Sequence, residues 1–144
     1  MIQPETHWRL LLIDDDEDDF IITRDLLRQA TGEQVQLEWC PDYQQGLSRL
    51  LEQRYDLYLV DYRLGAESGL ELIKQARQAA VTRPIILLTG QGDARLDASA
   101  IELGAADYLV KGAFDSAQLL RSIRYAIDRS QATALMTASE QRYR

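Results

Sequence analysis

The chain has 144 residues, the usual length of a single domain, and a hydrophobic share of 46%, which is enough to build a core. Its net charge of −7 disfavours nucleic acid and anionic membrane surfaces as partners, because no basic block offsets the acids. No apolar run approaches the roughly 20 residues that cross a bilayer, and Met1 to Arg9 lacks the apolar stretch of a secretion signal. We therefore expect a soluble cytoplasmic domain with no nucleic-acid and no membrane partner.

Apolar runs alternate along the chain with stretches of helical periodicity. Four of the five runs are continuous, which is typical of strands buried on both faces, whereas residues 35–40 alternate apolar and polar side chains as a sheet-edge strand does. Gly32 is placed to end the first helix in a left-handed conformation. The expected elements are a strand at 9–13, helix at 18–30, strand at 35–40, helix at 43–53, strand at 56–60, helix at 68–80, strand at 84–89, helix at 94–103, strand at 106–110 and helix from 115 onward.

Strict alternation of strand and helix with short links implies right-handed parallel crossovers. The predicted fold is therefore α/β: a doubly wound five-stranded parallel sheet, in a (βα)5 flavodoxin-like three-layer sandwich. The expected domains are an N-terminal tail at 1–8, one globular domain at 9–130 and a C-terminal helical extension or linker at 131–144.

Polar side chains stand at the ends of four predicted strands. Asp14 and Asp15 follow the first, Asp61 the third, Thr89 the fourth and Lys111 the fifth. Ligands of such sheets bind beyond the carboxyl ends of the strands, so these groups should converge there. Three carboxylates, a hydroxyl and an ammonium suit a divalent metal and a phosphoryl group, and Mg²⁺ prefers oxygen ligands.

Neighbouring polar residues receive simpler interpretations. The acids of the first helical turn, Asp16 to Asp19, are expected to complement the helix dipole. His7 is the only histidine and precedes the first strand, so we expect a solvated tail residue rather than a phosphodonor. A phosphoryl group would have to come from another protein or from another part of the polypeptide.

The strand-end residues resemble those of a response-regulator receiver domain of two-component signalling, over about residues 8 to 130. The pair Asp14-Asp15, the lone Asp61, the dipeptide Thr89-Gly90 and the run from Tyr108 to Lys111 stand in the order of that family and with its approximate spacing. The resemblance implies a signalling phosphoacceptor rather than an enzyme. The reactions that it implies for this phosphoacceptor are self-catalysed phosphotransfer and slow autodephosphorylation. Its partner would be a histidine kinase or a histidine phosphotransfer protein.

The resemblance also implies a role for each acid. Asp61 would be the residue phosphorylated. Asp15 and Asp61 would bind Mg²⁺ together with the backbone carbonyl of Arg63, and Asp14 would act partly through metal-bound water.

Phosphoryl binding and switching are implied in the same way. Thr89 and Lys111 would bind the phosphoryl oxygens, and Tyr108 would turn inward as Thr89 moves toward the phosphoryl group. The output would then lie on the face formed by the helix at 94–103, the strand at 106–110 and the helix from 115.

Two glycines depart from the family pattern. Gly112 stands where receivers commonly have a proline joined by a cis peptide, and a cis bond to a non-proline residue costs about 2.5–4 kcal/mol. The geometry after Lys111 is therefore left open. Gly65 replaces a frequent proline four residues after Asp61 and removes no reactive group.

Three alternatives share parts of this pattern. A haloacid-dehalogenase-like phosphatase has the spacing of Asp14 and Asp16, but it needs an acidic strand end after Lys111. A flavodoxin-like cofactor binder needs a phosphate cradle where this chain has acids. A degenerate receiver used only for docking or dimerisation is disfavoured because all five chemical groups are present.

The C-terminal segment predicts a projecting helix. No Gly or Pro follows Asp128, and Leu120, Ile127 and Ala134 are seven residues apart, as the seam of a homodimer requires. Leu135 and Met136 extend this sparse apolar face, and a single solvated helix is the alternative. The ending Ser139 to Arg144 resembles the lead-in to a sensory PAS domain, which implies a PAS or other output domain in the full chain.

Overall fold

The computed structural model describes residues 7–90 and 94–142. Its elements are β1 (Trp8–Ile13), α1 (Glu17–Thr31), β2 (Val35–Cys40), α2 (Tyr43–Glu52), β3 (Leu57–Asp61), β4 (Arg63–Leu64), β5 (Glu67–Ser68), α3 (Gly69–Gln78), β6 (Ile85–Thr89), α4 (Ala94–Glu102), β7 (Asp107–Val110) and α5 (Ser116–Arg142). Helices therefore alternate with the long strands, as the sequence predicts.

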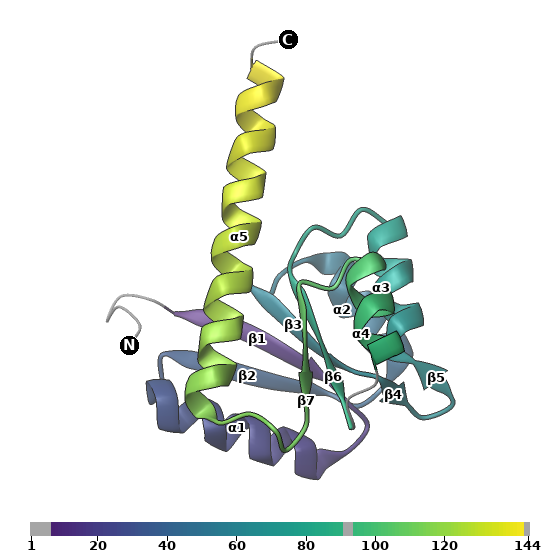
Figure 1. Cartoon of the computed structure of the whole chain (residues 1–144), viewed down its shortest axis with the longest axis vertical. Coiled ribbons are helices and arrows are strands. Elements are labelled where there is room, and N and C mark those ends of the chain that lie inside the picture. The colour runs from purple at the N-terminus through teal and green to yellow at the C-terminus, as the bar shows by residue number, and fades with distance from the viewer. Residues whose placement is uncertain (1–6, 91–93, 143–144) are drawn as a thin grey trace.

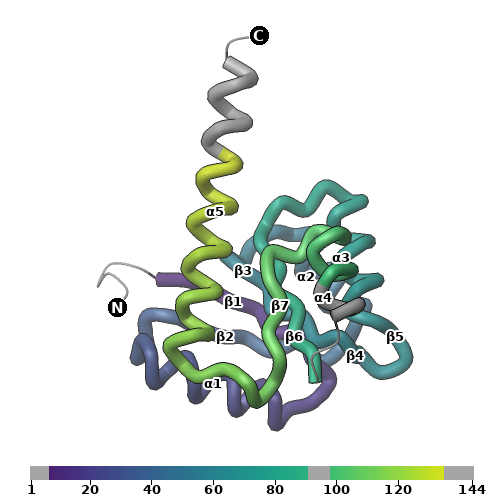
Figure 2. The backbone as a smooth tube through the Cα atoms, in the orientation of Figure 1, coloured from purple at the N-terminus to yellow at the C-terminus, as the bar shows by residue number. Residues whose placement is uncertain are grey.

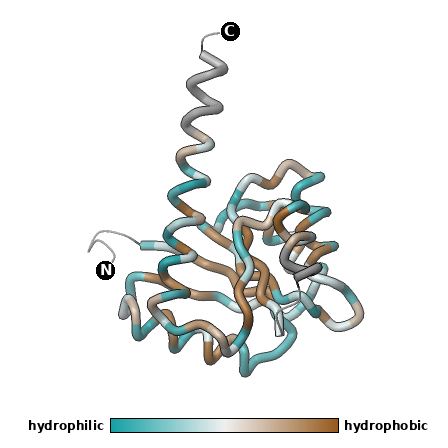
Figure 3. The backbone as a smooth tube through the Cα atoms, viewed as in Figure 1, coloured by the Kyte–Doolittle hydropathy of each residue, from teal (hydrophilic) through white to brown (hydrophobic). Residues whose placement is uncertain are grey.

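The long strands form one parallel sheet in the order β2-β1-β3-β6-β7. Helices α1 and α5 cover one face, and α2, α3 and α4 cover the other (Figure 1). Successive side chains of a strand point to opposite faces, so Leu10 and Leu12 join the core under α1 and α5, while Leu11 and Ile13 join the opposite core. The three-layer α/β sandwich is thus confirmed, and the hydrophobic strands lie inside it (Figure 3).

Strand β2 lies at one edge of the sheet, as its alternating pattern predicts. Most element boundaries differ from the predicted ones by one or two residues. One difference affects the site, because Asp61 is the last residue of β3 rather than the first residue after it. The short antiparallel pair β4 and β5 was not predicted, and Gly65 forms its turn with a φ of +64°.

Helix α5 begins on the sheet and continues as one helix past the globular body (Figure 2). Its inner side chains are buried against the sheet, and they include Leu120 and Ile127. The predicted dimer seam is therefore wrong at these two positions, since both pack into their own domain. The side chains of Leu135 and Met136 and those of the ending Ser139 to Arg144 lie outside the described residues.

Over the described residues, none of the helices combines the length and the apolar character that a bilayer-spanning segment needs.

Candidate functional site

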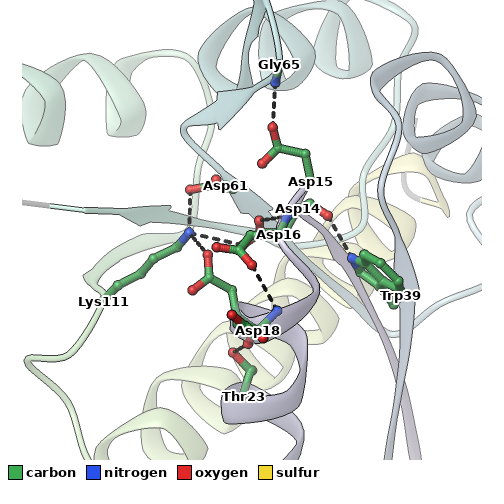
Figure 4. Close-up of polar contacts among 10 residues, drawn as sticks. Asp14, Asp15, Asp16, Asp18, Thr23, Trp39, Asp61, Gly65 and Lys111 are labelled. Atoms are coloured by element: carbon green, nitrogen blue, oxygen red, sulfur yellow. Dashed lines mark hydrogen bonds and ion pairs between the residues drawn. The ribbon is translucent and has the colours of Figure 1, made fainter.

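Acidic and basic side chains meet at the carboxyl ends of β1, β3 and β7. Asp14 follows β1 and is fully buried, and Asp61 ends β3 with 7% of its surface exposed. Lys111 follows β7, and its Nζ lies 3.1 Å from Asp14 Oδ2 and 3.0 Å from Asp61 Oδ1 (Figure 4). The structure therefore brings together three of the side chains that the sequence places at strand ends.

The backbone around Asp14 is fixed by neighbouring groups. The indole Nε1 of Trp39 donates a hydrogen bond of 2.7 Å to the Asp14 carbonyl oxygen, and the Trp39 ring stacks on Phe20. The backbone N–H of Asp16 donates to Asp14 Oδ1 at 2.9 Å, while Asp16 itself caps α1 by accepting from Asp18 N. Asp14 Oδ2 is left facing the ammonium of Lys111.

Thr89 ends β6 beside Lys111. The backbone N–H of Lys111 donates to the Thr89 carbonyl oxygen at 2.8 Å, which places Lys111, just after β7, beside the last residue of β6. The Thr89 side chain is buried, and among the described residues its Oγ1 has no hydrogen-bond partner. A buried hydroxyl normally has one, so Thr89 has a donor available to a ligand.

Asp15 lies apart from this ion-pair cluster. Its Oδ2 accepts a hydrogen bond of 2.9 Å from the backbone N–H of Gly65, in the turn between β4 and β5 (Figure 4). The left-handed φ of Gly65 is conformationally easy for glycine, so this turn needs no proline. Arg63, whose carbonyl is the other predicted metal ligand, lies in β4 two residues after Asp61.

Asp19 is a site residue that the sequence interpretation missed. It lies in the first turn of α1, forms an ion pair with Lys111, and offers a carboxylate oxygen within 4.8 Å of oxygens from Asp14 and Asp61. We expected it only to complement the helix dipole. The available signal was helical spacing, because the cap at Asp16 places Asp19 about one turn further along the same face.

The charges of the cluster are unbalanced. Burial raises the pKa of Asp14 to about 7, with Asp61 adding to the rise and Lys111 opposing it. Burial also raises the pKa of Asp61, again against the effect of Lys111. For Lys111, burial would lower the pKa, but hydrogen bonds to Asp19 and Asp61 outweigh it and the pKa is raised.

Three carboxylates around one ammonium can accept further positive charge. Asp14, Asp19 and Asp61 supply hard oxygen donors that lie close enough together to surround one ion. This donor chemistry fits Mg²⁺, which binds one or two carboxylates and keeps several waters. The predicted cofactor is therefore compatible with the residues present.

Tyr108 precedes Lys111 in the sequence, on β7, and Gly112 follows it directly. Tyr108 pairs with Leu87 across β6 and β7, is partly buried, and packs on the core beneath α2, α3 and α4. The peptide between Lys111 and Gly112 is trans, and Gly112 has a φ of +80°. The backbone geometry after Lys111, which the absence of a proline had left open, is therefore a trans peptide followed by a left-handed glycine.

Comparison with known proteins identifies the class. The family model of the response regulator receiver domain matches residues 10–124. The response regulator ArlR of Staphylococcus aureus is 33% identical over 121 residues, which cover 84% of this chain and 53% of that protein. The chain thus spans about half the length of the curated relatives it matches.

Solved structures agree on the fold. The signal receiver domain of an HD domain-containing protein from Pseudomonas fluorescens superposes with a TM-score of 0.74 at 28% identity, covering 88% of this chain and 98% of that chain. A CheY-like response regulator receiver domain protein from Methanospirillum hungatei has a TM-score of 0.75 at 23% identity, covering 89% and 99%. The chain belongs to the response regulator receiver family.

Proposed function

We propose that this domain accepts a phosphoryl group on Asp61 from a histidine kinase or a histidine phosphotransfer protein. The observation that carries the proposal is the position of the Asp61 carboxylate, at the end of a buried strand and 3.0 Å from Lys111 Nζ. Membership of the receiver family supports the same assignment. In the transfer, an Asp61 oxygen bonds to phosphorus while the phosphorus–nitrogen bond of the donor breaks, and its electron pair stays on the imidazole nitrogen, which then takes up a proton.

The surrounding residues would bind and orient the phosphoryl group. Lys111 would move from its carboxylate partners to a phosphoryl oxygen, and the Thr89 hydroxyl would donate to another. Asp14, Asp15 and Asp61 with the Arg63 carbonyl would hold Mg²⁺, with Asp14 acting partly through a bound water. The ion would supply positive charge against the developing charge of the phosphoryl oxygens.

The same residues would connect the site to an output surface. Movement of Thr89 toward the phosphoryl group would empty space beside β7, and Tyr108 would turn inward to fill it. Because Tyr108 is only partly buried, its ring has room to change position. The surface formed by α4, β7 and α5 would then differ between the two states, and a PAS or other output domain in the full chain would read that difference.

The competing functions receive less support from this arrangement. A degenerate docking module has no need for a lysine held between buried carboxylates. A haloacid-dehalogenase-like phosphatase needs an acidic strand end after Lys111, whereas the described chain continues from there into α5. Both alternatives predict no stable phosphoprotein.

Intact-mass measurement after incubation with acetyl phosphate and Mg²⁺ tests the proposal. We expect the wild-type chain to gain the mass of one phosphoryl group and Asp61→Asn to gain none. Asp128→Asn, an exposed carboxyl on α5, is the matched control and should behave as the wild type. Undiminished phosphorylation of Asp61→Asn would move the nucleophile to another carboxylate and refute the assignment.

A further inference from the structure

A cavity lies at the opposite end of the sheet from the carboxylates. Its volume is about 700 Å³, within the range of small-molecule sites. Pro84 and Ala106, which precede β6 and β7, form part of its wall. The other side is formed by one face of α5: Ala126, Arg129, Ser130, Thr133 and Ala134. It therefore lies where α5 passes the amino ends of these strands (Figure 1).

The lining of this cavity is cationic and otherwise apolar or hydroxylic. Arg77 and Arg129 contribute the charges, Thr82 and Ser130 contribute hydroxyls, and no acidic residue is among the described lining residues. The chain as a whole carries a net charge of −7. A cavity with two guanidinium groups on so acidic a protein is therefore a local exception.

Arg77 is a partly buried cation whose hydrogen-bond partners are carbonyl groups. Its Nε and Nη2 donate to Gly104 O at 3.1 and 2.8 Å, and its Nη1 donates to Val81 O and Arg83 O at 2.7 and 2.9 Å. Among the described residues it forms no salt bridge, and burial lowers its pKa. Carbonyl oxygens accept from four of the five N–H groups of Arg77 without cancelling its charge, so one N–H and the positive charge are left for an anion.

We propose that this cavity binds a small amphipathic anion, with its carboxylate, sulfonate or phosphate group between Arg77 and Arg129. The apolar body would lie on the wall formed by Pro84, Ile101 and Ala105. A guanidinium pair recognises such oxyanions through charge-assisted hydrogen bonds. None of its residues belongs to the carboxylate cluster, so the proposal does not rest on phosphorylation of Asp61.

A fluorescent aromatic sulfonate, 8-anilinonaphthalene-1-sulfonate, is a suitable probe. We expect saturable binding to the folded full chain, and binding of its uncharged analogue N-phenyl-1-naphthylamine to be about tenfold weaker or more. Equal binding of the two compounds would show that charge plays no part and would overturn the proposal.

Two variants locate the probe without disturbing Arg77. Arg129→Gln should weaken binding about tenfold, because it removes the exposed guanidinium. Arg121→Gln removes the same charge from the same helix outside the cavity and should leave binding within about twofold. An equal loss of probe affinity in both variants would show that the probe is attracted by the overall positive charge of α5 rather than bound in the cavity, and it would refute the site.

A third variant tests whether the probe occupies the volume of the cavity. Ala134→Trp adds bulk at an exposed lining position without changing charge, and it should weaken the probe about tenfold. Urea unfolding of each variant must match the wild type, so that a loss of binding is not a loss of folding. Unchanged binding in Ala134→Trp would place the probe elsewhere. Probe binding that appears only as the chain dimerises in sedimentation would assign the cavity to a second copy and would equally refute the proposal.

Discussion

Asp14 is the most enclosed carboxyl of the site, and its burial has a cost. Its pKa rises to about 7, so the folded chain keeps a proton that the unfolded chain has already lost above pH 4. The free energy of unfolding should therefore fall as pH rises from about 4 to about 7, and the cost should be fully present above pH 7.

Asp14→Asn should relieve this cost. At pH 8 without Mg²⁺, we expect the free energy of unfolding to rise by about 1–3 kcal/mol, and its decline between pH 4 and 7 to become shallower. Urea unfolding at several pH values measures both effects. Asp128→Asn, on the exposed side of α5, should change neither. An Asp14→Asn variant that is no more stable than wild type at pH 8 would contradict this account.

Asp15 and Asp19 can be separated by their effect on metal binding. Asp15 can keep its hydrogen bond to Gly65 through Oδ2 and offer Oδ1 to an ion, whereas Asp19 is already paired with Lys111. We expect Asp15→Asn to weaken Mg²⁺ binding about tenfold and Asp19→Asn to change it less than about threefold.

The fluorescence of Trp39 provides the readout for this comparison, because its indole is hydrogen-bonded to the Asp14 carbonyl. A Trp8→Phe background removes the other tryptophan of the chain. A greater loss of Mg²⁺ affinity in Asp19→Asn would make Asp19 the ligand in place of Asp15.

Among the secondary-structure elements, α3 begins in close contact with the end of β3. Gly69 begins α3, its N–H donates to Tyr62 O at 2.7 Å, and a Cβ built on it would lie 2.2 Å from Asp61 O. Any other residue must push the helix away from the strand end that carries Asp61. The close approach of this helix to β3 therefore depends on glycine.

Gly69→Ala should reduce the free energy of unfolding by about 2–3 kcal/mol. It should also slow phosphorylation by acetyl phosphate, because the Asp61 backbone would shift. Gly90→Ala is the control for stability, since a Cβ there would meet open space. Chemical denaturation and a phosphorylation time course measure the two effects, and a fully stable Gly69→Ala chain would show that the helix start can move freely.

The same elements show what sequence patterns could and could not predict. Continuous apolar runs identify buried parallel strands, and parallel strands have convergent ends, so the meeting of Asp14, Asp61 and Lys111 was predictable. Helical spacing from the cap at Asp16 indicates the face on which Asp19 lies, but its contact with Lys111 also depends on the angle at which α1 leaves β1, which no local pattern encodes. The pair β4 and β5 was missed because two-residue strands are too short to have a period.

At the scale of the whole molecule, α5 is the element available to a second copy. Because Leu120 and Ile127 are buried in their own domain, pairing along the predicted seam is left with the helix beyond residue 130. Few apolar positions remain there, so we expect association with a dissociation constant on the order of 0.1 mM or weaker. Sedimentation of residues 1–144 against 1–130, with and without beryllofluoride, measures it. Identical monomers at high concentration in every case would remove the helix from self-association.

Because α5 is one continuous helix, a small rotation at its base becomes a larger displacement at its far end. The helix begins at Ser116, shortly after Lys111, and its 27 residues correspond to a rod about 40 Å long. A tilt of about 5° at its base would carry its far end about 3.5 Å sideways, since the displacement grows with the length of the rod. A rearrangement at Lys111 that tilts α5 on the sheet would thus become, at the tip, a movement as large as the spacing between packed atoms.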